Sequence, residues 1–474
     1  RNSAAAIQLE TRLKDAELMH KQASGKMKGD VVALRQEVEA YRGRCAELEA
    51  SLQPTVDRFN AQIQDCMVRL AEEQNLRKKY HNQIQDMKGA IRVFCRFRPL
   101  VQRELAQGDS VALRRVDAFT VQLERPTPKG LETKAFQFDS IFDASNTQEE
   151  VFSDCRDLVQ SAVDGYNVTI FAYGQTGAGK THTMYGSPQD PGLAPRSIES
   201  LFDVIGREQK AGTKKFGVKA YMIEVYKQDI IDLLSKGPGP LKPGEKPRKE
   251  GLEVKRDPGR GIMFVDGVTE RTISSPQELH ALLAEGEKRR HVTATSMNAT
   301  SSRSHLLLSV TVQCHVRDPE QIIYGKITLC DLAGSERPKK SEVSGDALKE
   351  AIEINKSLSA LGDVMDALTK GAKQVPYRNH KLTMLMQDSL GGTAKTLMFV
   401  NCSPAASNSE ETSMSLKWAS RARQVTNDVR RNADSKEVAR LKQVIAMMSQ
   451  AQNAQNDVAA VEMRPSMSAE QLAS

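Results

Sequence analysis

Residues 174–181 read Gly174-Gln175-Thr176-Gly177-Ala178-Gly179-Lys180-Thr181, and they are the strongest indication of the fold. It fits the pattern G-x-x-x-x-G-K-[ST] of a phosphate-binding loop. Residues 168–173 are β-branched and aromatic enough to form a buried strand before it, and a helix is predicted to open at His182. In that context we expect backbone N–H groups to surround a polyphosphate, Lys180 to meet the outer phosphates and the Thr181 hydroxyl to hold Mg²⁺. The preceding strand disfavours the alternative, a glycine-rich turn that matches by chance.

Size and composition limit the class of protein. The chain has 474 residues, of which 39% are hydrophobic and 27% charged, so we expect a large core and more than one structural unit. No apolar run approaches the ~20 residues that cross a bilayer, and the N-terminus has neither an initiator Met nor the apolar core of a signal peptide. The 7 cysteines form no C-x-x-C pair, which predicts a reduced compartment and no structural zinc. We therefore expect a fragment of a longer intracellular chain, without membrane insertion and without a nucleic acid as its partner.

Residues 1–88 have the composition of a coiled coil, rich in Ala, Gln, Glu, Lys and Arg and nearly free of aromatics. Apolar side chains step by three and four from Val31 to Leu52, and again from Val56 to Met87 with the register displaced by four. Helix-breaking residues are predicted to interrupt the segment at Gly25, Gly29 and Pro54. The pattern predicts a homodimer through a coiled coil. A single amphipathic helix packed on the following domain is the alternative.

The periodicity changes from helical to strand-like at Lys88-Gly89, where a globular domain is predicted to begin. Strands are expected at 91–99, 168–173, 216–226, 306–312, 322–330 and 396–402, and helices at 151–163, 195–205, 276–287 and 348–368. This alternation predicts an α/β sheet that is covered on both faces. We expect a coil at 1–88, a nucleotide domain at 89–427 and a separate tail at 428–474. The Pro- and Gly-rich stretch 235–249 is predicted to be a basic surface loop, which either meets an acidic partner or is a solvated linker.

Two further stretches carry polar groups that nucleotide hydrolysis needs. Residues 331–336, DLAGSE, follow an apolar strand, so we expect Asp331 beside the Mg²⁺ site and the Gly334 N–H near the γ-phosphate. Residues 298–305, NATSSRSH, stand before another strand. Ser302 is expected to reach the phosphate or the metal, and Arg303 to pair with Glu336 when the γ-phosphate is present. Singly, each stretch would be an ordinary turn or helix cap, but their order after a phosphate-binding loop favours a shared site.

The chemistry expected at this site is positioning and charge stabilisation, because the motifs contain no carboxylate that is dedicated to the attacking water as a simple base. The predicted catalytic residues are Lys180, Ser302, Arg303, Gly334 and Glu336. ATP is favoured over GTP, because Asn355-Lys356-Ser357 is followed by Leu358 and offers no carboxylate to the guanine edge.

Six motifs together resemble the kinesin motor domain. They are RFRP at 96–99, GQTGAGKTHTM at 174–184, NATSSRSH, DLAGSE, INKSLSAL at 354–361 and VPYR at 375–378. The resemblance implies a P-loop NTPase kinesin motor fold, with a central mixed β-sheet between helix layers and an α-helical coiled-coil neck before it. It implies ATP hydrolysis with Mg²⁺, coupled to movement along microtubules, and it makes NATSSRSH the first switch and DLAGSE the second.

The resemblance also completes the set of site residues. It implies that Arg96, Pro99 and His182 hold the adenine ring. The predicted nucleotide-binding set is Arg96, Pro99, Gly174, Gln175, Thr176, Gly177, Ala178, Gly179, Lys180, Thr181, His182, Asn298 and Ser301, and the metal set is Thr181, Ser302 and Asp331.

Basic residues after the second switch match regions where kinesins meet the microtubule, whose tubulin subunits are acidic. They are Lys339, Lys340, Lys349, Arg378 and Lys381. Met384 stands where many relatives have Arg, a loss of one exposed cationic contact. The expected location is therefore the microtubule cytoskeleton of the cytoplasm. A microtubule-binding anchor without turnover is the alternative function.

Both flanks of the predicted motor resemble kinesins whose motor is C-terminal and minus-end-directed. The usual joint Gly-Asn is here Gly89-Ala90. Beyond the motor, the stretch Asn432–Met448 predicts a basic amphipathic helix that begins after a cap at Asp434 or Ser435. It resembles that of the plant calmodulin-binding kinesins, which implies calmodulin or a related Ca²⁺ sensor as a partner. The expected contacts are Val438, Arg440, Leu441, Lys442, Ile445 and Met448. A short helix packed on the motor, or a second coil, is the alternative.

Overall fold

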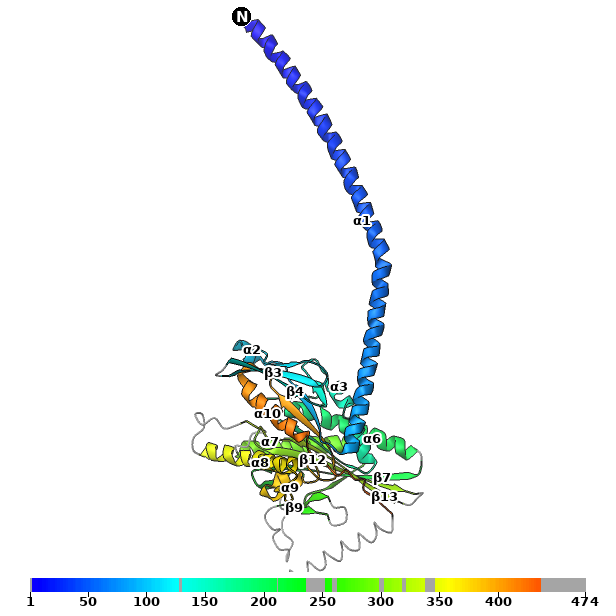
Figure 1. The fold of residues 1–474 in the computed structure, drawn as a ribbon, viewed down its shortest axis with the longest axis vertical. Helices are drawn as coiled ribbons and strands as arrows, with labels where there is room; N and C mark the ends of the chain where they lie inside the picture. The colour runs from blue at the N-terminus through cyan, green and yellow to red at the C-terminus, as the bar shows by residue number, and fades with distance from the viewer. Residues whose placement is uncertain are drawn as a thin grey trace, which may run out of the picture. The chain divides into compact units, whose positions relative to one another are not determined.

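The computed structural model describes residues 2–127, 130–210, 212–235, 252–257, 262–297, 302–317, 321–336 and 346–435. By its contacts the chain divides into two units, Arg1–His81 and Asn82–Ser474. Figure 1 traces the chain and labels its elements.

The first unit is formed by most of helix α1, which runs unbroken over Asn2–Lys88 and whose last turns belong to the second unit. The breaks predicted at Gly25, Gly29 and Pro54 are wrong. Each of these residues disfavours a helix by only about 1–3 kcal/mol, which neighbouring helix formers can offset. The large apolar side chains of the predicted coiled-coil stripe, from Val31 to Ile63, are between 45% and 62% exposed to solvent.

The second unit is built on a mixed sheet in the order β11-β7-β12-β13-β6-β14-β1-β5. In addition, β8 pairs with β7 and β15 pairs with β13. Strands β13, β6, β14, β1 and β5 are parallel, whereas β11, β7 and β12 join antiparallel. Their bounds are β1 Arg92–Phe97, β5 Ser140–Phe142, β6 Asn167–Tyr173, β7 Lys214–Tyr226, β8 Asp229–Asp232, β11 Arg271–Ile273, β12 His305–Val316, β13 Gln321–Asp331, β14 Lys395–Cys402 and β15 Ala433–Ser435. The predicted central strands are confirmed.

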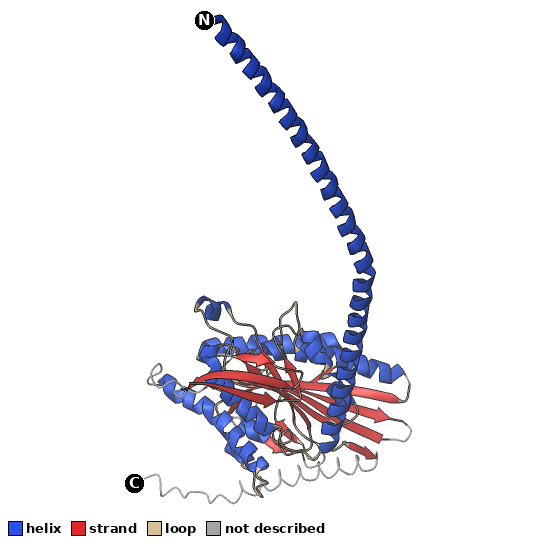
Figure 2. Ribbon diagram, turned by 45° about the horizontal axis from the view of Figure 1, so that its top comes forward, coloured by secondary structure: helices blue, strands red, loops and turns tan. Residues whose placement is uncertain are grey.

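Helices cover both faces of this sheet (Figure 2). Alternate residues of each strand point to opposite faces, so Ile170 of β6 packs in one core and Phe171 in the other. One face carries α3 Gln148–Ser153, α4 Arg156–Val163, α5 Lys180–Met184, α6 Leu193–Lys210 and α7 Pro276–Met297. The other carries α8 Asp346–Thr369, α9 Lys381–Leu385 and α10 Ser409–Ala422. The predicted α/β layering is confirmed, although the helix expected over 151–163 is divided between α3 and α4.

Smaller elements surround the main sheet. They are the three-stranded sheet of β2 Leu113–Arg115, β3 Thr120–Thr127 and β4 Gly130–Gln137, the hairpin of β9 Glu253–Arg256 and β10 Met263–Asp266, helix α2 Gln102–Ala106, and the 3-10 turns η1 Tyr377–Asn379 and η2 Ala406–Asn408. Among the helices of the described ranges, none combines the length and apolar character that crossing a membrane requires.

The described chain ends as a strand that was not predicted, at the residues expected to cap the tail helix. Residues Ala433–Ser435 form β15, antiparallel to Gln321–Ile323 of β13. On the same edge of β13, β6 pairs with residues 326–331, so β15 continues the row that β6 occupies. The Asn432 N–H donates to Gly165 O at 2.8 Å and fixes the start of this segment. Cross-strand hydrogen bonds therefore shape this segment, and the tail helix expected after it lies in residues 436–474, outside the described part.

Candidate nucleotide-binding site

The phosphate-binding loop leaves the carboxyl end of β6, between the ends of β13 and β14. This edge of a parallel sheet is where α/β proteins bind ligands. Gly174 has φ +149°, and a Cβ there would lie 2.1 Å from Asn401 O, so a larger residue cannot turn the chain at this point. Gly179, at φ +97°, is the cap from which α5 starts. The predicted strand, loop and helix are confirmed.

Lys180 is the first residue of α5, and its side chain is buried against the loop. Its ammonium donates to Gly174 O at 2.8 Å and to Gln175 O at 2.9 Å. Burial lowers the pKa of Lys180, while the charges of Asp331 and Glu336 act in the opposite direction. The ammonium group therefore lies at the loop, where the negative charges of Asp331 and Glu336 favour its protonated form.

Thr181 and Asp331, two of the predicted metal ligands, are in contact. The Thr181 hydroxyl donates to Asp331 Oδ2 at 2.7 Å, although the two residues are 150 positions apart in sequence. Asp331 Oδ1 is buried and has no hydrogen-bond partner among the described residues, and burial raises the pKa of this carboxyl. One carboxylate with one hydroxyl suits Mg²⁺, which takes few protein ligands and completes its shell with water and phosphate oxygens. The residues present therefore fit the ion.

The second switch is hydrogen-bonded to both the first switch and the loop. The Gly334 N–H donates to Ser302 O at 2.9 Å, and the Ser335 N–H donates to Gly174 O at 3.1 Å. The Glu336 carboxylate accepts from the N–H of Thr176 at 2.8 Å and from its hydroxyl. The three predicted motifs thus meet, with Glu336 held by the loop.

The residues expected at the adenine ring divide into two groups. Arg96 is buried, and its guanidinium donates to Gln148 Oε1 at 2.7 Å and to Thr183 Oγ1 at 3.2 Å. Gln148 Nε2 in turn donates to His182 O at 2.7 Å. Pro99 and His182 are exposed beside the loop region. Arg96 therefore acts here on the position of His182 through Gln148.

Arg98 braces the loop, a role that the sequence did not reveal. Its Nε donates to Gly177 O at 2.7 Å, and its two terminal nitrogens donate to the two oxygens of Glu104 at 2.7 Å each. This bidentate pair lowers the pKa of Glu104 to about 2. The loop's exposed carbonyl is thus tied to the end of β1.

A second network that the sequence did not reveal lies behind the switches. Arg290 of α7 donates to Ser304 O at 3.1 Å and to Glu224 at 3.3 Å, and its Nη1 lies 4.0 Å from Asp331 Oδ2. The Ser304 hydroxyl also donates to Glu224. Both charged groups are buried, so the end of the first switch is fixed to β7 and α7.

The other predicted site residues are distributed as follows. Arg378 is exposed in η1, and Lys381 opens α9 and donates to Leu252 O at 3.4 Å. Lys349 belongs to α8, which packs against both elements. Outside the described residues lie Asn298, Ser301, Lys339 and Lys340, together with the whole calmodulin set Val438, Arg440, Leu441, Lys442, Ile445 and Met448.

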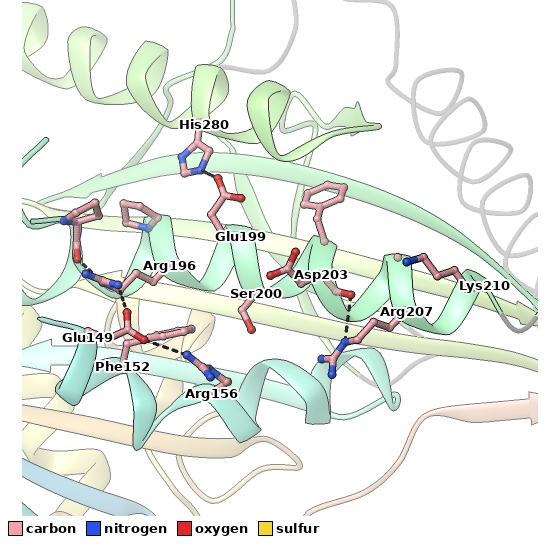
Figure 3. A pocket seen from close by; sticks show the side chains of 14 residues that line it. Glu149, Phe152, Arg156, Arg196, Glu199, Ser200, Asp203, Arg207, Lys210 and His280 are labelled. Atoms are coloured by element: carbon pink, nitrogen blue, oxygen red, sulfur yellow. Dashed lines mark hydrogen bonds and ion pairs between the residues drawn. The ribbon is translucent and has the colours of Figure 1, made fainter. Parts of the chain in front are cut away.

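A separate groove of about 820 Å³ lies among α3, α6 and α7 (Figure 3). Glu149 accepts from Arg156 at 3.0 Å and also pairs with Arg196, and Glu199 contacts His280 at 2.7 Å. None of the described loop or switch residues lines this groove. The groove is therefore distinct from the candidate nucleotide site at the carboxyl end of β6.

A phosphate loop that is bonded to the second switch, which in turn is bonded to the first, is the arrangement of a P-loop nucleotide hydrolase, and the fold and site place this protein in that class. Residues 96–425 match the sequence model of the kinesin motor domain family. The chain belongs to the kinesin family. Kinesin motor domains are ATP hydrolases.

Relatives of the chain carry kinesin names. Kinesin-like protein KIN-14E of Arabidopsis thaliana is 50% identical over 386 residues, which are 81% of this chain and 30% of that protein. Kinesin-like protein KIN-14I of Oryza sativa subsp. japonica is 48% identical over 430 residues, 88% of this chain and 33% of that protein. The chain thus spans about a third of the length of these relatives. A solved structure of a fast kinesin, discussed for its ATPase mechanism and microtubule interactions, aligns with a TM-score of 0.66 at 36% identity, over 73% of this chain and 95% of its own.

Proposed function

We propose that this chain is a microtubule-stimulated ATPase that moves toward microtubule minus ends. The observation that carries the proposal is the bonding of the second switch: its amides contact the loop and the first switch at 3.1 Å and 2.9 Å. A segment held at both places changes position when a γ-phosphate competes for the same groups. The nucleotide state is then converted into movement of the chain.

The site residues have distinct roles in this proposal. The Lys180 ammonium exchanges the carbonyls of Gly174 and Gln175 for phosphate oxygens, and the Gly334 N–H exchanges Ser302 O for the γ-phosphate. Thr181 and Asp331 hold Mg²⁺, which supplies positive charge to the phosphates when it is bound.

The attacking water is positioned by the switches. Glu336 exchanges Thr176 for Arg303, which closes the two switches over the phosphate. Ser302 then orients the water, so the chain contributes geometry and charge rather than a strong base. The contact of Glu336 with Thr176 supports this role, because it keeps the carboxylate within the site.

The proposed microtubule face consists of Lys339, Lys340, Lys349, Arg378 and Lys381. The exposure of Arg378 and the packing of α8 against η1 and α9 support it, because one helix adjoins two of the basic elements. Its cations attract an acidic filament at moderate salt concentration.

Minus-end movement is proposed from the junction between helix and motor. Gly89 O accepts from the Asn427 N–H at 2.7 Å, and the Ile91 N–H donates to Val425 O at 3.1 Å. The end of α1 is therefore bonded to the last residues of the motor core, where a change in the core reaches the helix. We also propose a homodimer, because the apolar stripe of α1 is exposed. Inhibition by Ca²⁺-calmodulin through residues 438–448 remains a proposal from the sequence.

One gliding assay tests these functions. The chain is fixed to a surface, polarity-marked microtubules and ATP are added, and Ca²⁺-calmodulin is introduced midway. Minus-end-directed movement that stops on addition is the expected result. Plus-end-directed movement would contradict the direction, and continued movement would contradict the regulation. An ATPase rate that microtubules do not stimulate would favour a nucleotide-dependent anchor or crosslinker instead.

A further inference from the structure

His305 is a buried side chain that joins two functional elements. It opens β12, which is paired along its length with β7 and β13, and only 2% of its surface is exposed. Its Nδ1 accepts from the Ala333 N–H of the second switch at 3.0 Å. Its Nε2 lies 2.7 Å from the Ser357 hydroxyl in the middle of α8. The imidazole is thus a bridge that is fixed to the sheet.

The hydrogen bonds determine which ring nitrogen carries the proton. The Ala333 N–H can only donate, so Nδ1 accepts this bond and carries no proton. The Ser357 hydroxyl donates to Ile354 O at 2.6 Å, so its oxygen accepts from Nε2–H. Burial, together with nearby His380, Arg290 and Lys180, lowers the pKa of His305 to about 3, which keeps the ring neutral.

The backbone amides on either side of Ala333 are bonded to other acceptors. Leu332 N–H donates to Ala172 O at 3.2 Å, while the amides of Gly334 and Ser335 donate to the first switch and to the loop. Among the four amides of residues 332–335, that of Ala333 is the one bonded to a side chain that also contacts α8. A displacement of the second switch therefore reaches α8 through this ring.

We propose that His305 is the positioning residue that couples the second switch to α8. The proposal rests on the proposed function, since α8 packs against the elements that carry Arg378 and Lys381. While Ala333 is bonded to Nδ1, the ring holds Ser357 and the helix in one position. When Ala333 moves, the ring is released and α8 takes up its second position.

Two substitutions cut the bridge on its α8 side. Ser357→Ala removes the hydroxyl, and His305→Asn keeps an acceptor near Nδ1 but no longer reaches Ser357. Ser359→Ala, exposed on the same helix, and Ser309→Ala, buried on the same strand, are the matched controls. The full chain is sedimented with microtubules in ADP and in a non-hydrolysable ATP analogue. The measured quantity is the ratio of the two dissociation constants.

We expect each bridge variant to reduce this ratio about fivefold or more, and the double variant to reduce it no further, because both changes break one connection. Both controls are expected to keep the wild-type ratio. A lowered melting temperature with an unchanged ratio in Ser357→Ala, or additive effects in the double variant, would overturn the coupling role. If the wild-type chain itself bound equally in both nucleotides, the proposed function would fail and the coupling with it. Should His305→Asn not fold, Ser357→Ala alone decides.

Discussion

The Thr181 hydroxyl donates to Asp331 Oδ2 at 2.7 Å, and this bond joins the phosphate-binding loop to the end of β13. The loop that leads to Thr181 leaves the carboxyl end of β6, and Asp331 ends the adjacent parallel strand β13, which is why residues so distant in sequence meet. The pair places a hydroxyl and a carboxylate side by side, with the second carboxylate oxygen unpaired among the described residues.

Replacing Thr181 by Ala is expected to weaken Mg²⁺ binding about 10–100-fold, because it removes one ligand and the donor that orients Asp331. The measurement is the Mg²⁺ dependence of the release of a fluorescent ADP. Thr181→Ser keeps the hydroxyl and is expected to behave as the wild type. Unchanged Mg²⁺ dependence in Thr181→Ala would show that the pair does not bind the ion.

Replacing Glu336 by Ala is expected to retain nucleotide but reduce microtubule-stimulated turnover by about 10²-fold or more, since the carboxylate can no longer pair with Arg303. Steady-state ATPase assays and nucleotide binding by fluorescence measure the two effects. Glu336→Gln keeps an acceptor for Thr176 without the charge, and it separates the contact with the loop from the ion pair. Near-normal turnover in Glu336→Ala would refute the assignment.

Replacing Gly89 by Ala is expected to destabilise the junction by about 1–3 kcal/mol. Gly89 has φ +67°, and its new Cβ would lie 2.0 Å from Asn427 O, so the bond between these two residues must break. Gly108→Ala is the matched control: its φ is +66°, with no atom within 4 Å of the added Cβ. Thermal unfolding and gliding velocity measure the difference. Equal losses in the two variants would mean that only backbone strain matters.

Acidification from pH 7 to pH 5 is expected to destabilise the motor through its buried histidines. The pKa of His305 is about 3 in the folded chain, and that of an unfolded histidine is ~6.5. Below pH 6.5 the unfolded state binds a proton that the folded state does not, so the free energy of unfolding falls by up to about 1.4 kcal/mol per pH unit. Burial also lowers the pKa of His380, which acts in the same direction.

Urea unfolding at several pH values measures this slope. In His305→Asn the slope of the free energy of unfolding against pH is expected to decrease by the contribution of one titrating histidine. An unchanged slope would contradict the assignment of a neutral, buried His305 ring. Glu104 does not interfere in this window. Its folded pKa of about 2 gives a stabilisation that is present above the unfolded pKa and is lost only as the pH falls below about 4.3 toward 2.

The site could be predicted where its residues belong to short sequence motifs. Asp331 ends an apolar strand, and Lys180 and Thr181 close a glycine-rich loop that follows another, so the sequence shows both the residues and their place at one edge of the sheet. The contact of Arg98 with Gly177 O, and the network of Arg290 with Glu224, depend on which strands and helices are neighbours. Strand order leaves no local signal in a single sequence.

The wrong predictions have a common cause. Gly25, Gly29 and Pro54 were expected to end helices on local propensity, but one long helix tolerates them. The strand at Ala433–Ser435 was not predicted, because the open edge of β13 offers hydrogen bonds that local periodicity does not record. Local preference failed in both cases where cooperative backbone bonding decides.

Strand β13 connects two remote parts of the motor. At one end Asp331 faces the phosphate loop, and at the other Gln321–Ile323 pair with β15. For amide hydrogen exchange, this means that one strand contains two different reporters. The Tyr324 N–H donates to Asn432 O at 2.9 Å, so its exchange measures how often the segment that leads into β15 detaches. Exchange at 326–331, enclosed by β6 and β12, measures opening of the whole sheet.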